Sequence, residues 1–67
     1  MKLQLNGETT ETSAATVSAL IVEHGLDPAV PGIAVAVNGS VVPRARWGGH
    51  ILAEGDEVEL ITAMQGG

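Results

Sequence analysis

The residues best suited to chemistry are the last two of the sequence, Gly66 and Gly67. A terminal carboxylate that has to enter a narrow channel in another protein is best carried on residues without Cβ atoms. The five residues from Ala63 to Gly67, when fully extended, reach up to roughly 17 Å. Once adenylated, such a carboxylate becomes an electrophile from which a sulfur donor can displace the nucleotide and leave a thiocarboxylate. The pattern favours chemistry at the Gly67 carboxylate, and it requires no catalytic side chain of this chain.

The residues ahead of Gly67 are candidates for binding a protein that acts on it. These candidates are Ile61, Ala63, Met64, Gln65 and Gly66. Ile61, Ala63 and Met64 would form an exposed apolar patch beside the tail. Ordinary surface exposure or additional packing explains these three residues equally well. A Gly-Gly end can also arise by chance in a chain with 9 glycines among its 67 residues.

The other chemistry-bearing residues do not make a convincing catalytic or metal site. His24 and His50 are the only histidines, and two isolated imidazoles supply too few ligands for a metal ion. Four carboxylates lie close together in the sequence, at Glu54, Asp56, Glu57 and Glu59. Their places in a turn and on an exposed strand face favour solvated charge over acid–base catalysis. Arg44 and Arg46 are expected to be solvated or paired with acids, and Trp47 is expected in the core more often than in an interface.

Composition argues against several classes of function. The chain has no cysteine, so it has no disulfide, thiolate nucleophile or cysteine persulfide of its own. Its net charge of −5 argues against nucleic-acid binding and against an electrostatic membrane anchor. The same charge favours partners with a basic docking surface. No apolar run approaches the ~20 residues of a membrane span and no targeting segment is visible, so we expect a cytoplasmic protein.

The first half of the chain predicts a hairpin and a helix. Apolar residues at positions 1, 3 and 5 alternate with polar ones, as in a strand with one buried face. Asn6-Gly7 is the signal of a type I′ turn, and residues 8–12 would be the returning strand. Thr16 can cap a helix whose buried stripe lies at positions 17, 20 and 21, with Ser13 as a competing cap. Gly25 is well placed to end that helix.

The second half predicts three further strands. After the proline-containing loop 27–32, residues 33–37 alternate β-branched residues with alanines, and Asn38-Gly39 repeats the turn signal. A short strand at 41–42 is stopped by Pro43, residues 44–52 are irregular, and 57–62 form a last strand with Ile61 on its outer face. This order indicates one α+β domain over residues 1–67, with a flexible tail at about 63–67. Its mixed sheet would have about five strands, with one main helix packed on one face.

Two segments carry a resemblance to a known family. They are the run Val-Pro-Arg-Ala-Arg-Trp at 42–47 and the run Gly-Asp-Glu-Val-Glu-Leu-Ile at 55–61, which leads into Gly66-Gly67. Together with Thr16-Val17 and with Val-Asn-Gly at 37–39, they are similar to the ThiS family of thiazole-biosynthesis sulfur carriers. The resemblance covers essentially the whole chain and implies the ubiquitin-like β-grasp fold. The Val-Pro-Arg and Trp signature is fairly specific among such carriers, whereas all of them share the terminal Gly-Gly.

The resemblance implies a carrier protein and not an enzyme. Gly67 would be adenylated with ATP by an activating enzyme, converted to a thiocarboxylate by a sulfur donor such as a persulfide-bearing enzyme, and used by thiazole synthase. No cofactor would be bound by the carrier itself, and we expect a monomer because a carrier changes partners. Three alternatives remain open: a sulfur carrier for molybdopterin or another pathway, a ubiquitin-like modifier joined to lysines, and a structural interaction module.

Overall fold

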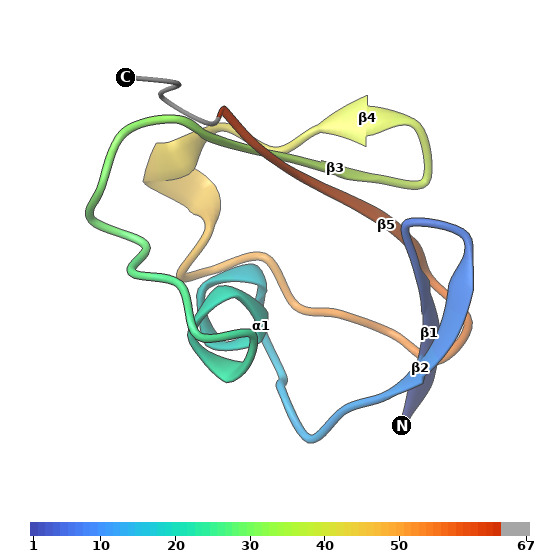
Figure 1. The fold of residues 1–67 in the computed structure, drawn as a ribbon. Helices are drawn as coiled ribbons and strands as arrows, with labels where there is room; N and C mark the ends of the chain where they lie inside the picture. Colours follow the sequence, from blue (N-terminus) through green and yellow to red (C-terminus); the bar gives the residue numbers. More distant parts are fainter. Residues whose placement is uncertain (64–67) are drawn as a thin grey trace.

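The computed structural model describes residues 1–63. Its elements are, in chain order, β1 (Lys2–Leu5), β2 (Glu8–Glu11), α1 (Val17–Glu23), β3 (Ile33–Val37), β4 (Ser40–Val41), the 3₁₀ turn η1 (Arg44–Arg46) and β5 (Glu57–Thr62). The strands form one sheet in the order β2-β1-β5-β3-β4, and α1 lies on one side of it (Figure 1). The predicted element order, the five-strand mixed sheet and the single α-helix are confirmed within these residues.

The strand β5 lies at the centre of the sheet. On one side it runs parallel with β1, and on the other it runs antiparallel with β3, all of whose residues pair with it. Residues of β5 that face α1 alternate with residues on the outer face, because side chains of a strand point to opposite faces in turn. Val58 is buried and Leu60 half-buried on the inner face, whereas Ile61 is exposed. The predicted division of β5 into two faces is therefore confirmed.

Both hairpins turn on an Asn-Gly pair. Asn6 and Asn38 each have a φ of 52°, and Gly7 and Gly39 each have a φ of 83°. A type I′ turn requires positive φ at both central residues, which asparagine tolerates and glycine adopts freely. The two shortest connections of the sheet thus lie where the sequence predicts them.

The same two asparagines also bind the central strand. The side chain of Asn6 donates a hydrogen bond to the Leu60 carbonyl at 3.1 Å and accepts one from the Leu60 amide at 2.9 Å. The side chain of Asn38 accepts from the Glu57 amide at 2.9 Å and donates to the Asp56 carboxylate at 3.0 Å. Each turn therefore holds a different part of β5, one near its start and one near its end.

The helix α1 begins at its predicted cap. The side-chain oxygen of Thr16 accepts a hydrogen bond from the Ala19 amide at 3.2 Å, which satisfies a donor of the first turn. At the other end Gly25 has a φ of 78°, and the Leu26 amide donates to the Ile21 carbonyl at 3.1 Å. Within residues 1–63 no helix is long and apolar enough to cross a membrane.

The core between α1 and the sheet is aliphatic except for one indole. Its buried apolar residues are Leu3, Ala14, Val17, Leu20, Ile21, Val35, Val37, Val42, Trp47, Leu52 and Val58. Trp47 is 2% exposed, and its indole N–H donates to the Val42 carbonyl at 2.9 Å. The prediction that Trp47 belongs to the core is confirmed.

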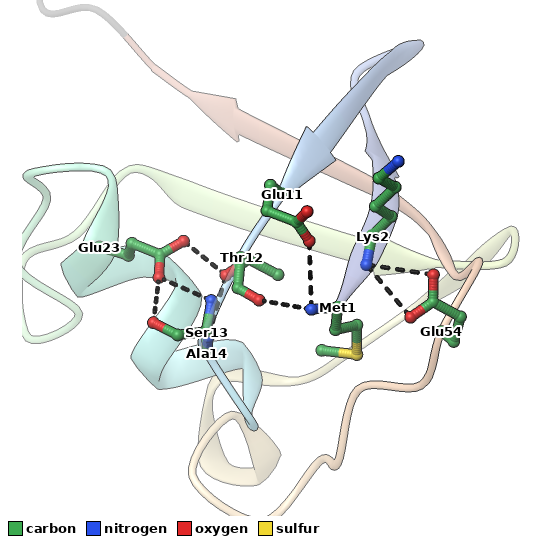
Figure 2. A network of polar contacts seen from close by, with 8 residues as sticks. All are labelled: Met1, Lys2, Glu11, Thr12, Ser13, Ala14, Glu23 and Glu54. Carbon is green, nitrogen blue, oxygen red and sulfur yellow. Dashed lines mark hydrogen bonds and ion pairs between the residues drawn. The ribbon is translucent and has the colours of Figure 1, made fainter.

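A polar network joins the first hairpin to the end of α1 (Figure 2). The Glu23 carboxylate accepts hydrogen bonds from the Thr12 hydroxyl at 2.5 Å and from the Ser13 amide and hydroxyl, each at 3.2 Å. The Thr12 hydrogen bond is the largest influence that holds the pKa of Glu23 below its ordinary value, and the Ser13 bonds act in the same direction. Ser13 is thus a partner of the last helical residue, and the competing prediction that it caps the helix is wrong.

Candidate functional site

The candidate site begins where the chain leaves the sheet at the end of β5. Thr62 is the last residue of β5, and the amide of Ala63 donates a hydrogen bond to the Gly32 carbonyl at 2.6 Å. This bond continues the pairing between β3 and β5 by one residue. The predicted site residues Met64, Gln65, Gly66 and Gly67 lie outside the described residues.

An apolar strip lies on the outer face of the sheet. We define it by Ala34, Ala36, Val41 and Ile61, which come from β3, β4 and β5. Ile61 lies opposite Ala34, and Val41 lies opposite Ala36. Ile61 is 59% exposed and Val41 is 76% exposed. The predicted exposure of Ile61 is confirmed, and its role in partner binding stays a prediction.

Val41 is missing from the predicted patch, although the sequence contains the signal for it. A two-residue turn at Asn38-Gly39 fixes the register, so that Ala36 pairs with Val41. Residues directly opposite each other in a hairpin share a face. Because the alanines of β3 were expected on one face together, Val41 belongs on that face as well.

Glu57 and Glu59 lie on the same face of β5 as Ile61. They alternate with the buried Val58, so both carboxylates are presented beside the apolar strip. An open hollow at this place is lined by Gln4, Asn6, Gly7, Gly39, Glu57, Val58 and Glu59. The outer face therefore combines an apolar strip with negative charge. A partner protein with an apolar surface flanked by basic residues would be complementary to it.

The other two acids of the predicted cluster bind backbone groups. The Asp56 carboxylate accepts from the Ala53 amide at 2.8 Å and from the Asn38 side chain. The Glu54 carboxylate accepts from the Lys2 amide at 3.1 and 3.2 Å. These contacts hold the turn before β5 and leave the four acids without the arrangement of an acid–base pair. Among residues 1–63 no three His, Cys, Asp or Glu side chains gather as metal ligands.

Arg44 is exposed, but it has hydrogen-bond partners that were not predicted. Its guanidinium donates to the Pro28 carbonyl and to the Val30 carbonyl, the latter at 2.6 Å. It also lies over the Trp47 ring, 4.4 Å from the ring centroid. Its exposure agrees with the expectation that it is solvated, and its hydrogen-bond partners are backbone carbonyls in place of an acid. Every residue type has a backbone carbonyl, so no residue pattern could indicate these partners.

The whole chain is similar to known proteins. It matches the ThiS family over residues 3–67. It is 31% identical over 67 residues, the whole of both chains, to Sulfur carrier protein ThiS of Escherichia coli (strain K12). The crystal structure of the thiamine biosynthesis protein ThiS from Geobacter metallireducens matches it with a TM-score of 0.79 and 27% identity over all of both chains.

A solution structure of a thiamine biosynthesis protein from Geobacter metallireducens matches with a TM-score of 0.81 and 28% identity, over all of this chain and 88% of the other. The shared fold is the α+β, ubiquitin-like β-grasp fold with a mixed five-strand sheet and one helix. Sequence and structure agree, and this chain belongs to the ThiS family.

Proposed function

We propose that this chain is a sulfur carrier protein for thiamine biosynthesis, acted on by partner enzymes and not itself a catalyst. The observation that carries the proposal is the similarity to the Escherichia coli Sulfur carrier protein ThiS over the whole of both chains. Because that similarity includes the last residues, the proposal extends to Gly67. It treats residues 1–67 as one domain with a tail at about 63–67, working as a cytoplasmic monomer that changes partners.

The Gly67 carboxylate is the reacting group in this proposal. In an activating enzyme, one carboxylate oxygen attacks the α-phosphorus of ATP, pyrophosphate leaves, and an acyl-adenylate forms. The outer sulfur of a persulfide on a partner enzyme then attacks the acyl carbon, AMP leaves, and an acyl disulfide forms. A second thiol of that partner attacks the cysteine sulfur of the acyl disulfide, breaks the S–S bond and leaves a disulfide on the partner, so that the thiocarboxylate is released. The resulting thiocarboxylate supplies sulfur to thiazole synthase. A chain without cysteine has no thiol side chain for this task, so the sulfur has to be carried at the terminus.

The described residues support docking on the outer face of the sheet. Ile61 is exposed on the strand that leads directly to Ala63, so a protein bound over the apolar strip would lie close to the tail. Interfaces commonly have an apolar centre and a polar rim. Glu57 and Glu59 would provide an acidic part of that rim. Ile61, Ala63, Met64, Gln65 and Gly66 are accordingly the proposed partner-binding residues.

The test is the intact mass of the protein after incubation with ATP, the activating enzyme and a sulfur donor. We expect a gain equal to the exchange of one oxygen atom for one sulfur atom. A Gly67-deleted variant, folded but lacking the reacting carboxylate position, is the control and should show no gain. Transfer from the loaded protein to thiazole synthase, measured as thiazole formation, then tests the pathway.

Other outcomes would contradict parts of the proposal. A loaded terminus that supplies sulfur to molybdopterin formation and not to thiazole synthase would make the chain a carrier for another pathway. Conjugates with lysines on a denaturing gel would indicate a ubiquitin-like modifier. If partners proven active on another carrier leave the mass unchanged, sulfur carriage itself is wrong.

A further inference from the structure

We propose that Arg44 is a positioning residue for the proposed carrier function. By holding the loop 27–32, it fixes the point at which the chain leaves the sheet at Ala63. The proposal rests on the proposed function and adds the residue that fixes Ala63, the last described residue ahead of the reacting terminus. It is carried by a continuous series of contacts from the core, through Arg44 and the loop, to Ala63.

The series starts at Trp47, which anchors Arg44 to the core. The indole is 2% exposed and is fixed by its hydrogen bond to the Val42 carbonyl at 2.9 Å. The guanidinium of Arg44 lies over this ring at 4.4 Å, a geometry in which a cation is attracted to an aromatic face. An exposed arginine therefore rests on a buried side chain that is hydrogen-bonded within the core.

The next step is from Arg44 to the loop. The two terminal nitrogens of its guanidinium donate to the carbonyls of Pro28 and Val30, one nitrogen to each. A planar fork can reach two acceptors at once, whereas a lysine ammonium acts as a single point charge. The loop also has local turn bonds, from the Val30 amide to the Asp27 carbonyl and from the Ala29 amide to the Asp27 carboxylate. Arg44 adds a contact from outside the loop, and this contact fixes the loop relative to the core.

The last step is from the loop to the tail. Gly32 ends the loop with a φ of 90°, which a residue with a side chain rarely adopts. Its carbonyl accepts the hydrogen bond from the Ala63 amide at 2.6 Å. In Figure 1 the green loop, the gold η1 turn and the dark red end of β5 meet at the same end of the molecule. Loop position and tail departure are thus coupled through one backbone hydrogen bond.

This coupling affects how fast a docked carrier reacts. A partner bound over the apolar strip still has to receive Gly67 in one orientation, and a fixed departure point at Ala63 raises the effective concentration of the carboxylate there. Loosening the loop leaves the strip itself unchanged. The expected loss is therefore in kcat of activation at saturating carrier, with an unchanged KM for the carrier.

The first experiment measures hydrogen exchange of the Ala63 amide by NMR in the isolated protein. Arg44→Gln removes the fork and the charge, Arg44→Lys keeps the charge alone, and Arg46→Gln removes a charge from the same η1 turn. We expect Arg44→Gln to speed exchange of the Ala63 amide about tenfold, because the loop that carries its acceptor, the Gly32 carbonyl, then opens more often. Arg44→Lys should show most of that increase, and Arg46→Gln should show none. Equal exchange in Arg44→Gln and the wild-type protein overturns the proposal.

The second experiment measures ATP–pyrophosphate exchange with the activating enzyme. We expect kcat for Arg44→Gln to fall about fivefold with KM unchanged, and Arg46→Gln to keep the wild-type kcat. A rise in KM alone would make Arg44 a direct partner contact and overturn a positioning role. A fall in kcat fully accounted for by the unfolded fraction at the assay temperature, measured by circular dichroism, would also overturn a positioning role.

Failure of the proposed function can be distinguished from failure of the inference about Arg44. If the wild-type protein itself supports no ATP–pyrophosphate exchange, sulfur carriage is wrong, while the Ala63 amide measurement still decides whether Arg44 holds the loop that binds Ala63. Should Arg44→Gln fold poorly, Arg44→Lys, which keeps the charge and loses the paired donors, decides the role of Arg44. Ala63 amide exchange equal to that of the wild-type protein in Arg44→Lys would then overturn the proposal.

Discussion

Glu23 accepts three hydrogen bonds from Thr12 and Ser13 at the end of α1, and its lowered pKa has a defined consequence for stability. A carboxylate whose pKa is lowered by folding stabilises the native state above its unfolded pKa. That stabilisation is lost as the pH falls through the folded pKa. We expect Glu23→Gln to be less stable than wild type at neutral pH, with a difference that shrinks in the acid range below the ordinary glutamate pKa.

Urea unfolding at a series of pH values measures this effect. Glu8→Gln, at an exposed position on β2, is the matched control and should show no such pH-dependent difference. A loss in Glu23→Gln that stays constant down to low pH would show that the carboxylate does not stabilise the folded state through its charge.

Trp47 combines apolar burial with one hydrogen bond, and the two contributions can be separated. Trp47→Phe keeps an aromatic ring but leaves the Val42 carbonyl without its donor, which is expected to lower the unfolding free energy by about 1–3 kcal/mol. Trp47→Ala also leaves a cavity and should lose about 3–5 kcal/mol. Because neither variant has a tryptophan, unfolding has to be followed by circular dichroism. An equal loss in both variants would contradict this separation.

At the scale of the element, the helix cap decides where α1 begins. Thr16→Ala removes the acceptor for the Ala19 amide and should lower the unfolding free energy by about 1 kcal/mol. Thr16→Ser keeps an oxygen in place and should recover most of the loss. Chemical denaturation of the three proteins measures the difference, and a serine variant no better than alanine would contradict capping by the side-chain oxygen.

The strands and the helix could be predicted because their signals are local. Asn-Gly pairs set both hairpins, Thr16 and Gly25 bound α1, and alternation assigns the faces of β5. The hydrogen bonds of Arg44 could not be predicted, because its acceptors are carbonyls of a loop that only the folded chain brings near. The Glu23 network was missed for the same reason, since its hydroxyl partner lies eleven positions away in sequence.

The residues of the candidate site also differ in whether a local sequence pattern could predict them. Gly66-Gly67 and the exposed Ile61 could be read from the residue pattern, although only Ile61 lies among the described residues. To predict that Val41 lies on the outer face of the sheet, the register of its hairpin is needed as well as the residue type. The loop contact that reaches Ala63 required the complete fold, because Gly32 and Ala63 are distant in sequence and meet only when β3 pairs with β5.

At the scale of the whole molecule, the two exposed sides differ in what they offer a partner. Ile61 on the outer sheet face and Val22 on α1 are both 59% exposed, so they form a matched pair. If docking uses the apolar strip, Ile61→Ser should weaken binding to the activating enzyme about tenfold, as expected for about 1.4 kcal/mol of lost apolar contact. Val22→Ser should leave binding unchanged. Calorimetric titration measures both affinities, and equal losses would contradict docking through the sheet.

The asparagines that form the turns also bear on how the protein ages. An asparagine followed by glycine deamidates when the glycine nitrogen attacks the side-chain carbonyl carbon, ammonia leaves, and a succinimide ring closes. Water then opens the ring to aspartate or isoaspartate. Asn6 has both polar side-chain atoms bound to Leu60, so this attack has to wait until the turn opens and those bonds break. Its deamidation rate therefore records how often the first hairpin separates from β5. The amount of isoaspartate at Asn6 in stored protein would therefore increase with the frequency of that opening.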